Sequence, residues 1–247
     1  DVPNRTGKRK GVIVSATGNE TMYLISVSGA VSTGTAAIAG VVNTLVVKNT
    51  VRAQIRSREV DTAGAETTTG EHTVQSGGEV TVSAEDDSSI LDIAGGLAAS
   101  AGSVGVGATL VVLVFDKDVS ASIGSYGTVT ATGDVTVSAK TDDGLYLFAI
   151  TFGASSSVGV AGGVNVALFE NSVTAVLGGT VSAVNVSVTS DSDILFVNMA
   201  AGVAGGSSVG VAAVFVVSYL YNLTQSYIAS GANITAWNNP ISSDVLG

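Results

Sequence analysis

Three clusters of carboxylates occur at matching places in the chain and are the residues with the clearest potential chemistry. They are Glu85-Asp86-Asp87, Asp142-Asp143, and the pair Asp191 and Asp193. Carboxylate oxygens bind Ca²⁺, and paired acids hydrolyse glycosides when one serves as acid and the other as base or nucleophile. The matching place near the start of the chain holds the neutral Thr17-Gly18-Asn19, and the glycine-rich nonapeptide that binds Ca²⁺ is absent. We therefore predict solvated acidic turns, with no metal and no cofactor.

The composition excludes most sites that depend on cysteine or histidine. It has no Cys and one His among 247 residues, which excludes disulfides, thiolate ligands and sites built from several histidines. His72 lies in a polar insertion at 57–77, and no nucleophile-elbow sequence accompanies it. We interpret His72 as a surface residue and expect the protein not to be an enzyme.

Basic residues are concentrated at one end of the chain. The first 58 residues contain eight Lys and Arg and two acids, a charge of +6, whereas the remainder contains two basic residues and 18 acids, a charge of −16. An acidic body disfavours nucleic acid as a partner, because phosphate contacts need clustered Lys and Arg. The basic end is expected to contact a second copy, a host receptor or an anionic glycan. The candidate contact residues are Lys48, Arg52, Arg56, Arg58 and His72.

Internal repetition divides the chain into four repeats of about 51–68 residues. Val12-Ile13-Val14-Ser15-Ala16 recurs in similar form at Val80, Val135 and Val186, so the copies start 68, 55 and 51 residues apart. A repeat of this kind cannot bury its apolar face alone, so we expect one continuous domain of stacked repeats. Its parts are a basic extension (1–11), repeat 1 (12–79, with the insertion at 57–77), repeat 2 (80–134), repeat 3 (135–185), and repeat 4 with a closing segment (186–247).

Each repeat contains a long stretch with almost no charge, such as 88–115, which by length alone resembles a membrane helix. Glycine is too frequent for a helix, and Val104 and Val106 alternate with Gly105 and Gly107, which is the two-residue period of a strand. We therefore predict strands and no membrane span.

Polar segments are predicted to be turns that separate long strands from short ones. The predicted turns are the acidic clusters, 116–118, 124–127 and 132–134, and the predicted short strands are 119–123, 128–132 and 135–139. The pattern predicts an all-β, repetitive β-solenoid similar to a parallel β-helix. The alternative is an antiparallel hairpin-based β-sheet assembly or barrel, with hairpins that turn at segments such as Ala101-Gly102-Ser103.

One repeat position is occupied by Asn in three of the four repeats. Residues 48–55 align without gaps to 116–123 and 170–177, which places Asn49 and Asn171 together, and Asn222 follows in the fourth copy. Because Asn tolerates left-handed backbone and stacks on itself, we predict an asparagine ladder.

The repeat resembles segments of a known class of bacterial surface protein. Val-Thr-Val-Ser-Ala, an acidic segment, an Ala/Gly/Ser strand, Gly-Val-Gly-Ala and Val-x-Ala-x-Ile-Gly follow in this order. This order is similar to the repeat regions of filamentous-haemagglutinin-like and leukotoxin-like adhesins of the autotransporter and two-partner secretion routes. The resemblance runs from about Gly11 to Asn239 and implies an extracellular stalk or adhesive solenoid at the bacterial cell surface, without catalytic residues.

We accordingly expect a structural unit that self-associates head to tail, the basic first repeat of one copy docking on the acidic later repeats of the next. A receptor- or glycan-binding module and a polysaccharide-active β-helix enzyme are the alternatives.

Overall fold

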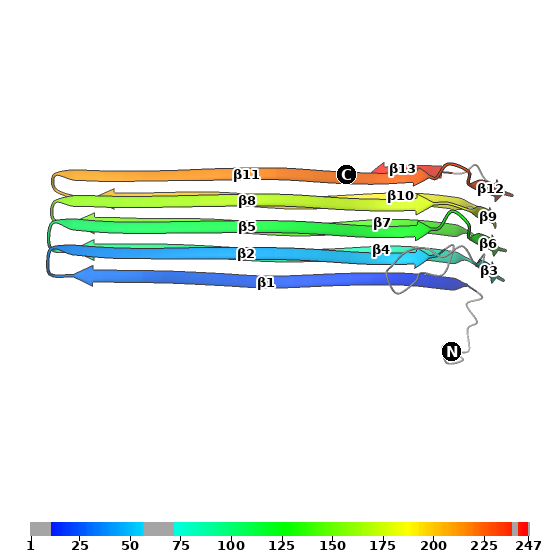
Figure 1. Ribbon diagram of the computed structural model, residues 1–247, viewed down its shortest axis with the longest axis horizontal. Helices are drawn as coiled ribbons and strands as arrows, with labels where there is room; N and C mark the ends of the chain where they lie inside the picture. Colours follow the sequence, from blue (N-terminus) through cyan, green and yellow to red (C-terminus); the bar gives the residue numbers. More distant parts are fainter. Residues whose placement is uncertain (1–10, 57–71, 239–241, 247) are drawn as a thin grey trace, which may run out of the picture.

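The protein is a parallel β-solenoid of four stacked rungs, as the computed structural model of residues 11–56, 72–238 and 242–246 shows. Each rung consists of two long strands joined by a tight turn, followed by a short strand (Figure 1). The described part of the chain contains no helix. The all-β solenoid expected from the sequence is therefore confirmed.

The described residues form thirteen strands in three sheets, one sheet for each position in the rung. The first sheet contains β1 (Val12–Ser32), β4 (Val80–Ser100), β7 (Val135–Ser155), β10 (Val186–Gly205) and β13 (Ser242–Leu246). The second contains β2 (Ala36–Ile55), β5 (Val104–Ile123), β8 (Val158–Leu177) and β11 (Val209–Ile228). The third contains β3 (Thr73–Ser76), β6 (Thr128–Ala131), β9 (Thr180–Ala183) and β12 (Asn233–Ala236).

Equivalent residues of successive repeats are direct lateral neighbours. Val82 pairs with Val137 in parallel register, so one repeat makes one rung. The long strands β4 and β5 lie in different sheets and are joined by the turn at 101–103. The antiparallel alternative, with a hairpin at that turn, is therefore wrong, because each long strand pairs with the next rung and not with its neighbour in the chain.

The acidic clusters predicted to be turns lie inside long strands. Glu85–Asp87 belong to β4, 116–118 belong to β5, and Val135 begins the 21-residue strand β7. The turn prediction is wrong because successive side chains of a strand point to opposite faces, so a strand can contain charged residues. The outward acids remain in water, and the inward acids pair with polar groups across the interior. The short strand predicted at 128–132 is present as β6.

The tight turns between the long strands are stabilised by serine. Ser32 and Ser100 each accept a hydrogen bond through Oγ from the backbone N–H two residues later, at 3.0 Å in both rungs. Ser155 does the same for the N–H of Ser157 at 3.2 Å. Serine hydroxyls favour such turns because they replace a backbone acceptor locally. These turns stack at one end of the molecule, which we call the tip.

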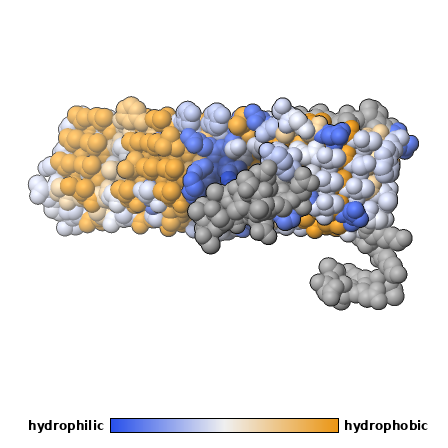
Figure 2. Space-filling model, turned by 45° about the vertical axis from the view of Figure 1, so that its right-hand side comes forward, coloured by the Kyte–Doolittle hydropathy of each residue, from blue (hydrophilic) through white to orange (hydrophobic). Residues whose placement is uncertain are grey.

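The two halves of each rung differ in the side chains that they place on the outer surface of the solenoid. We call residues 22–46, 90–114, 145–168 and 196–219 the tip half, and the remainder of each rung the base half. In the base half, Val80 and Val82 are fully buried and Thr81 and Ser83 point outward. Near the tip the small residues Gly105 and Gly107 point inward and the larger Val104 and Val106 point outward, and farther from the tip apolar residues occupy both faces, with Val111 and Leu113 buried inside. The surface of the tip half is consequently apolar, and a polar zone borders it (Figure 2).

Small inward residues in the tip half allow the two long sheets to approach closely. A Cβ atom at Gly153 would overlap the backbone oxygen of Val160, and one at Gly107 would overlap that of Phe152. The interior nearest the tip is therefore filled by backbone and small side chains, whereas larger residues such as Leu113 and Leu147 are buried inside the part of the tip half that adjoins the base half.

Within the described residues, the two ends of the stack are sheet edges that are largely unpaired. β1 and β2 form one end, and β10 and β11 form the other (Figure 1). β13 pairs with β10 along Ser187–Asp191 and covers only that part of the edge.

Candidate functional site

Two of the predicted contact residues are already paired within the chain. Lys48 on the outer face of β2 forms an ion pair with Asp116 of the next rung at 2.7 Å, and Arg52 pairs with Asp118 in the same way. The hydrogen bond that Lys48 donates to Asp116, followed by the negative charge of Asp116, raises the pKa of Lys48. These pairs are exposed, so they hold the first rung on the second only weakly.

The other predicted contact residues are not part of these ion pairs. Arg56 and His72 are exposed, Arg56 directly after β2 and His72 directly before β3. Arg58 lies outside the described residues. The insertion predicted at 57–77 contains β3, so its last part belongs to the solenoid.

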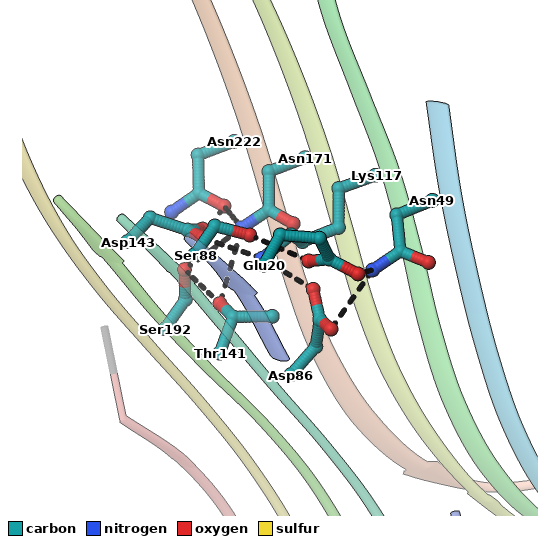
Figure 3. A network of polar contacts seen from close by, with 10 residues as sticks. All are labelled: Glu20, Asn49, Asp86, Ser88, Lys117, Thr141, Asp143, Asn171, Ser192 and Asn222. Atoms are coloured by element: carbon teal, nitrogen blue, oxygen red, sulfur yellow. Dashed lines mark hydrogen bonds and ion pairs between the residues drawn. The ribbon is translucent and has the colours of Figure 1, made fainter. Parts of the chain in front are cut away.

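A more extensive polar arrangement runs through the interior, along the stacking direction. We call it the polar column, and each rung contributes two or three side chains to it (Figure 3). Its members are Glu20 and Asn49 from the first rung, Asp86, Ser88 and Lys117 from the second, Thr141, Asp143 and Asn171 from the third, and Ser192 and Asn222 from the fourth.

Lys117 is the centre of the polar column. Its side chain is fully buried, and its Nζ lies 2.5 Å from a carboxylate oxygen of Asp86 and 2.5 Å from one of Asp143. The ammonium group also lies 5.4 Å from the centre of the Phe115 ring. A buried cation is tolerated only with partners of this kind, because removing a charge from water is costly. Lys117 thus ties the second rung to the third.

Asp143 is held in an environment that disfavours its charge. Burial raises its pKa to about 6, although the charge and hydrogen bond of Lys117 act in the opposite direction. Desolvation is the larger effect, and the nearby Asp86 and Asp142 add to it by like-charge repulsion. The carboxyl group therefore takes up a proton at a higher pH than an exposed aspartate does.

The upper part of the column is a neutral hydrogen-bond network. Nδ2 of Asn171 donates to Oδ1 of Asn222 at 3.1 Å and to Oγ of Ser192 at 3.1 Å. Thr141 donates to Ser192 across the rungs at 3.1 Å. The predicted asparagine ladder is confirmed for these two rungs.

The ladder does not continue to the first rung. Lys117 stands between Asn49 and Asn171 in the register, so Asn49 donates instead to Glu20 at 2.7 Å and to Asp86 at 2.8 Å. These asparagines do not use the left-handed backbone that Asn tolerates. They lie in extended strands, and no described residue other than glycine has a positive φ.

Sequence reasoning missed the most important members of the polar column. Lys117, Asp86 and Asp143 were read as turn residues because they are charged. The signal that identifies them is their position in the alternation, since Lys117 has the same parity as the buried Val119 and Ala121. A charge in an inward position implies an opposite charge on a facing strand.

The outward acids do not form a metal site. Asp87 and Asp142 are register neighbours on the outer face of the first sheet, beside a shallow depression of about 290 Å³ that also contacts Tyr146. Among the described residues, no group of three or more His, Asp or Glu side chains is placed to hold a metal ion. Nor does this part of the chain contain a helix that is long and apolar enough to cross a membrane.

The polar groups in the interior of the solenoid are thus paired between successive rungs. Comparison with protein-family models, with curated proteins and with solved structures finds no match for this chain.

Proposed function

We propose that the protein is an extracellular structural and adhesive unit of a bacterial surface stalk or fibre, which associates head to tail through the ends of its solenoid. The observation that carries this proposal is the in-register stacking of the rungs, together with the uncovered edges at both ends. Edge strands present unpaired N–H and C=O groups, which pair readily with another strand.

The polar column supports one direction and one register of stacking. It reaches both ends: Glu20 and Asn49 are half-buried in the first rung, and Asn222 is exposed in the fourth. A second copy stacked in register would place its Asn49 above Asn222 and extend the asparagine ladder, with its Glu20 above Ile194. A shift by one residue would turn every buried polar group outward, so this column favours a single register.

The surface composition agrees with a stalk rather than with an enzyme. The long faces repeat the same residue types from rung to rung, and the resemblance to secreted adhesin repeats supports placement outside a bacterial cell. Each added rung repeats the contacts of the previous one, so stacking lengthens the solenoid in one direction without a new kind of contact.

The test uses two adjacent positions on the exposed edge strand β11. Val216 is in register with the buried Asn165 and faces the interior, whereas Val217 faces outward, and their exposed fractions are 45% and 54%. A stacked copy would enclose residue 216 and leave residue 217 on the outer face.

We expect the wild-type protein to form filaments in electron micrographs at neutral pH, and V216E to form few or none because stacking would bury its charge. V217E is the matched control and should form filaments as the wild type does. Wild-type protein that remains as single particles at high concentration, or a V216E variant that forms normal filaments, would contradict the proposal.

A further inference from the structure

We propose that the tip half of the solenoid inserts into the hydrocarbon core of a phospholipid bilayer, while the base half remains in water. The inference rests on the proposed function in one respect, because stacking is needed to pair the edge strands. The supporting observations are the apolar outer faces of the tip half, their dimensions, and the residues at their boundary.

The first observation is the reversal of inside and outside described above. Along β7 the outward residues of the base half are Thr136, Ser138 and Lys140, and those of the tip half are apolar. Ile150 is 54% exposed and Phe152 is 37% exposed, although smaller residues lie between them in the interior. A soluble protein gains nothing from this arrangement, since it leaves large apolar surface in water.

The apolar surface covers both broad faces of the tip half. On the first sheet it includes Ile25, Ile93, Phe148 and Met199, which are register neighbours. On the second sheet it includes outward apolar residues of β2, β5, β8 and β11, such as the neighbours Val42, Leu110, Val164 and Phe215. A second copy would cover one of these faces, whereas lipid surrounds both. The two-sided surface therefore favours a bilayer over a face-to-face dimer.

The apolar surface has the depth of a bilayer core. The outward apolar residues span Tyr23 to Val31 on β1 and Ala36 to Val46 on β2. At about 3.3 Å per residue these distances are roughly 26 Å and 33 Å. The hydrocarbon core of a bilayer is about 30 Å thick. The turns at the tip, which contain Ser, Thr, Gly and Ala and no charged residue, then reach the opposite interface.

The boundary of the apolar surface carries the residues that favour a membrane interface. Tyr146 and Tyr23 lie in the last apolar row of the first sheet, and Tyr219 lies in the last row of the second. The next row of the outer face is charged in three rungs, at Lys48, Asp116 and Glu170, and contains Tyr221 in the fourth. Tyrosine is enriched at such interfaces because its ring is apolar and its hydroxyl is polar.

Backbone polar groups within the stack are compatible with lipid, and those at its edges are not. Strands between rungs pair along their full length, but β1, β2, β10 and β11 each leave one side unpaired outside the stretch covered by β13. Unpaired groups in hydrocarbon are costly. Head-to-tail stacking supplies the missing partners, so the inserted form is a row of stacked copies.

The first experiment measures flotation with vesicles of pure phosphatidylcholine, which carry no net charge and so exclude simple electrostatic attraction. We expect wild-type protein to float with the vesicles. The double variant I150K/V164K places one charge on each apolar face of the third rung and should reduce the floated fraction at least tenfold. S138K/T174K adds the same charges to the same two strands in the base half and should float like the wild type.

A second experiment locates the inserted part. Trp237 lies at the base end, next to β12, so bromines on the lipid acyl chains should not quench its fluorescence. In F152W/W237F the tryptophan lies in the tip half, and we expect strong quenching by the same lipids. Equal quenching of both tryptophans would contradict the predicted orientation.

Failure of this inference is distinguishable from failure of the stacking proposal. Wild-type protein that forms filaments without lipid but does not float would overturn insertion and leave stacking intact. Lateral pairs of filaments that I150K/V164K separates would identify a second copy as the occupant of the apolar faces, and would overturn insertion as well. Protein that floats only as single particles would overturn the stacked form of the inserted state.

Discussion

A single lysine determines whether the interior of the second rung is electrically balanced. Lys117 is fully buried and is shared by Asp86 and Asp143. Replacing it with Asn, the residue at this position in the other three rungs, would leave two buried carboxylates without a cation. We expect K117N to lower the free energy of unfolding by about 3–5 kcal/mol, measured by urea denaturation at pH 7.

A compensated variant separates charge imbalance from loss of packing. D86T/K117N/D143N gives the second rung the Thr and Asn that the third rung has at these positions and neutralises the remaining acid. Neutral groups of similar size often replace a buried ion pair at little cost, so this variant should recover most of the lost stability. If it is as unstable as K117N, charge imbalance is not the reason for the effect.

The raised pKa of Asp143 predicts a specific pH dependence. Its carboxyl group has a pKa of about 6 in the folded protein, above its value in the unfolded chain. The folded state therefore binds the proton more tightly, and its stability falls as pH rises through this window. Between pH 5 and 7 the loss should be about 1 kcal/mol. D143N should not show this loss in denaturant titrations, whereas D142N, which removes the adjacent outward acid, should retain it.

At the scale of the strands, the separation of the two long sheets depends on small inward residues. Gly153 shares its register position with Ala30, Ala98 and Ala204, and it faces the backbone of Val160. We expect G153V to lower stability by about 2–3 kcal/mol, because its side chain would push the sheets apart. This corresponds to a decrease in Tm of roughly 5–10 °C.

The matched control is an outward glycine on the facing sheet. A Cβ at Gly162 would lie 3.9 Å from the nearest atom, a backbone oxygen of Ala213, which is ordinary contact. G162V should therefore leave Tm unchanged or raise it slightly, since valine favours strands. A similar decrease in Tm for both variants would show that the effect is not one of sheet separation.

The strands were predictable in type but not in extent. Alternation at 104–107 identifies a strand, and the spacing of Val80, Val135 and Val186 predicts which residues become neighbours in the stack. The joining of 116–118 to 119–123 in one strand was not predictable from local composition, since Asp and Lys favour turns in isolation. Only the pairing of inward charges across two sheets, seen in Lys117, makes a continuous strand favourable there.

At the scale of the whole molecule, the uneven charge has a different role from the one the sequence suggests. Lys48 and Arg52 pair with Asp116 and Asp118 one rung away, so part of the basic end is balanced inside a single copy. The apolar tip half was also not predictable as an outer surface. Alternation of Val104 with Gly105 shows that large and small residues face opposite ways, but it does not say which of the two faces is inside.

The short strand β13 has a kinetic consequence for growth of the proposed fibre. An incoming copy in register would lay its residues 13–17 along Ser187–Asp191, where β13 is already paired. Growth at this end is then a strand exchange: five residues must detach before the new strand can close along the whole edge. Because the backbone hydrogen bonds that are lost are replaced by equivalent ones, the exchange affects the final equilibrium little. It affects the speed of elongation instead, and it does so at both ends of a fibre, because a copy that joins through its β10–β11 end must first release its own β13.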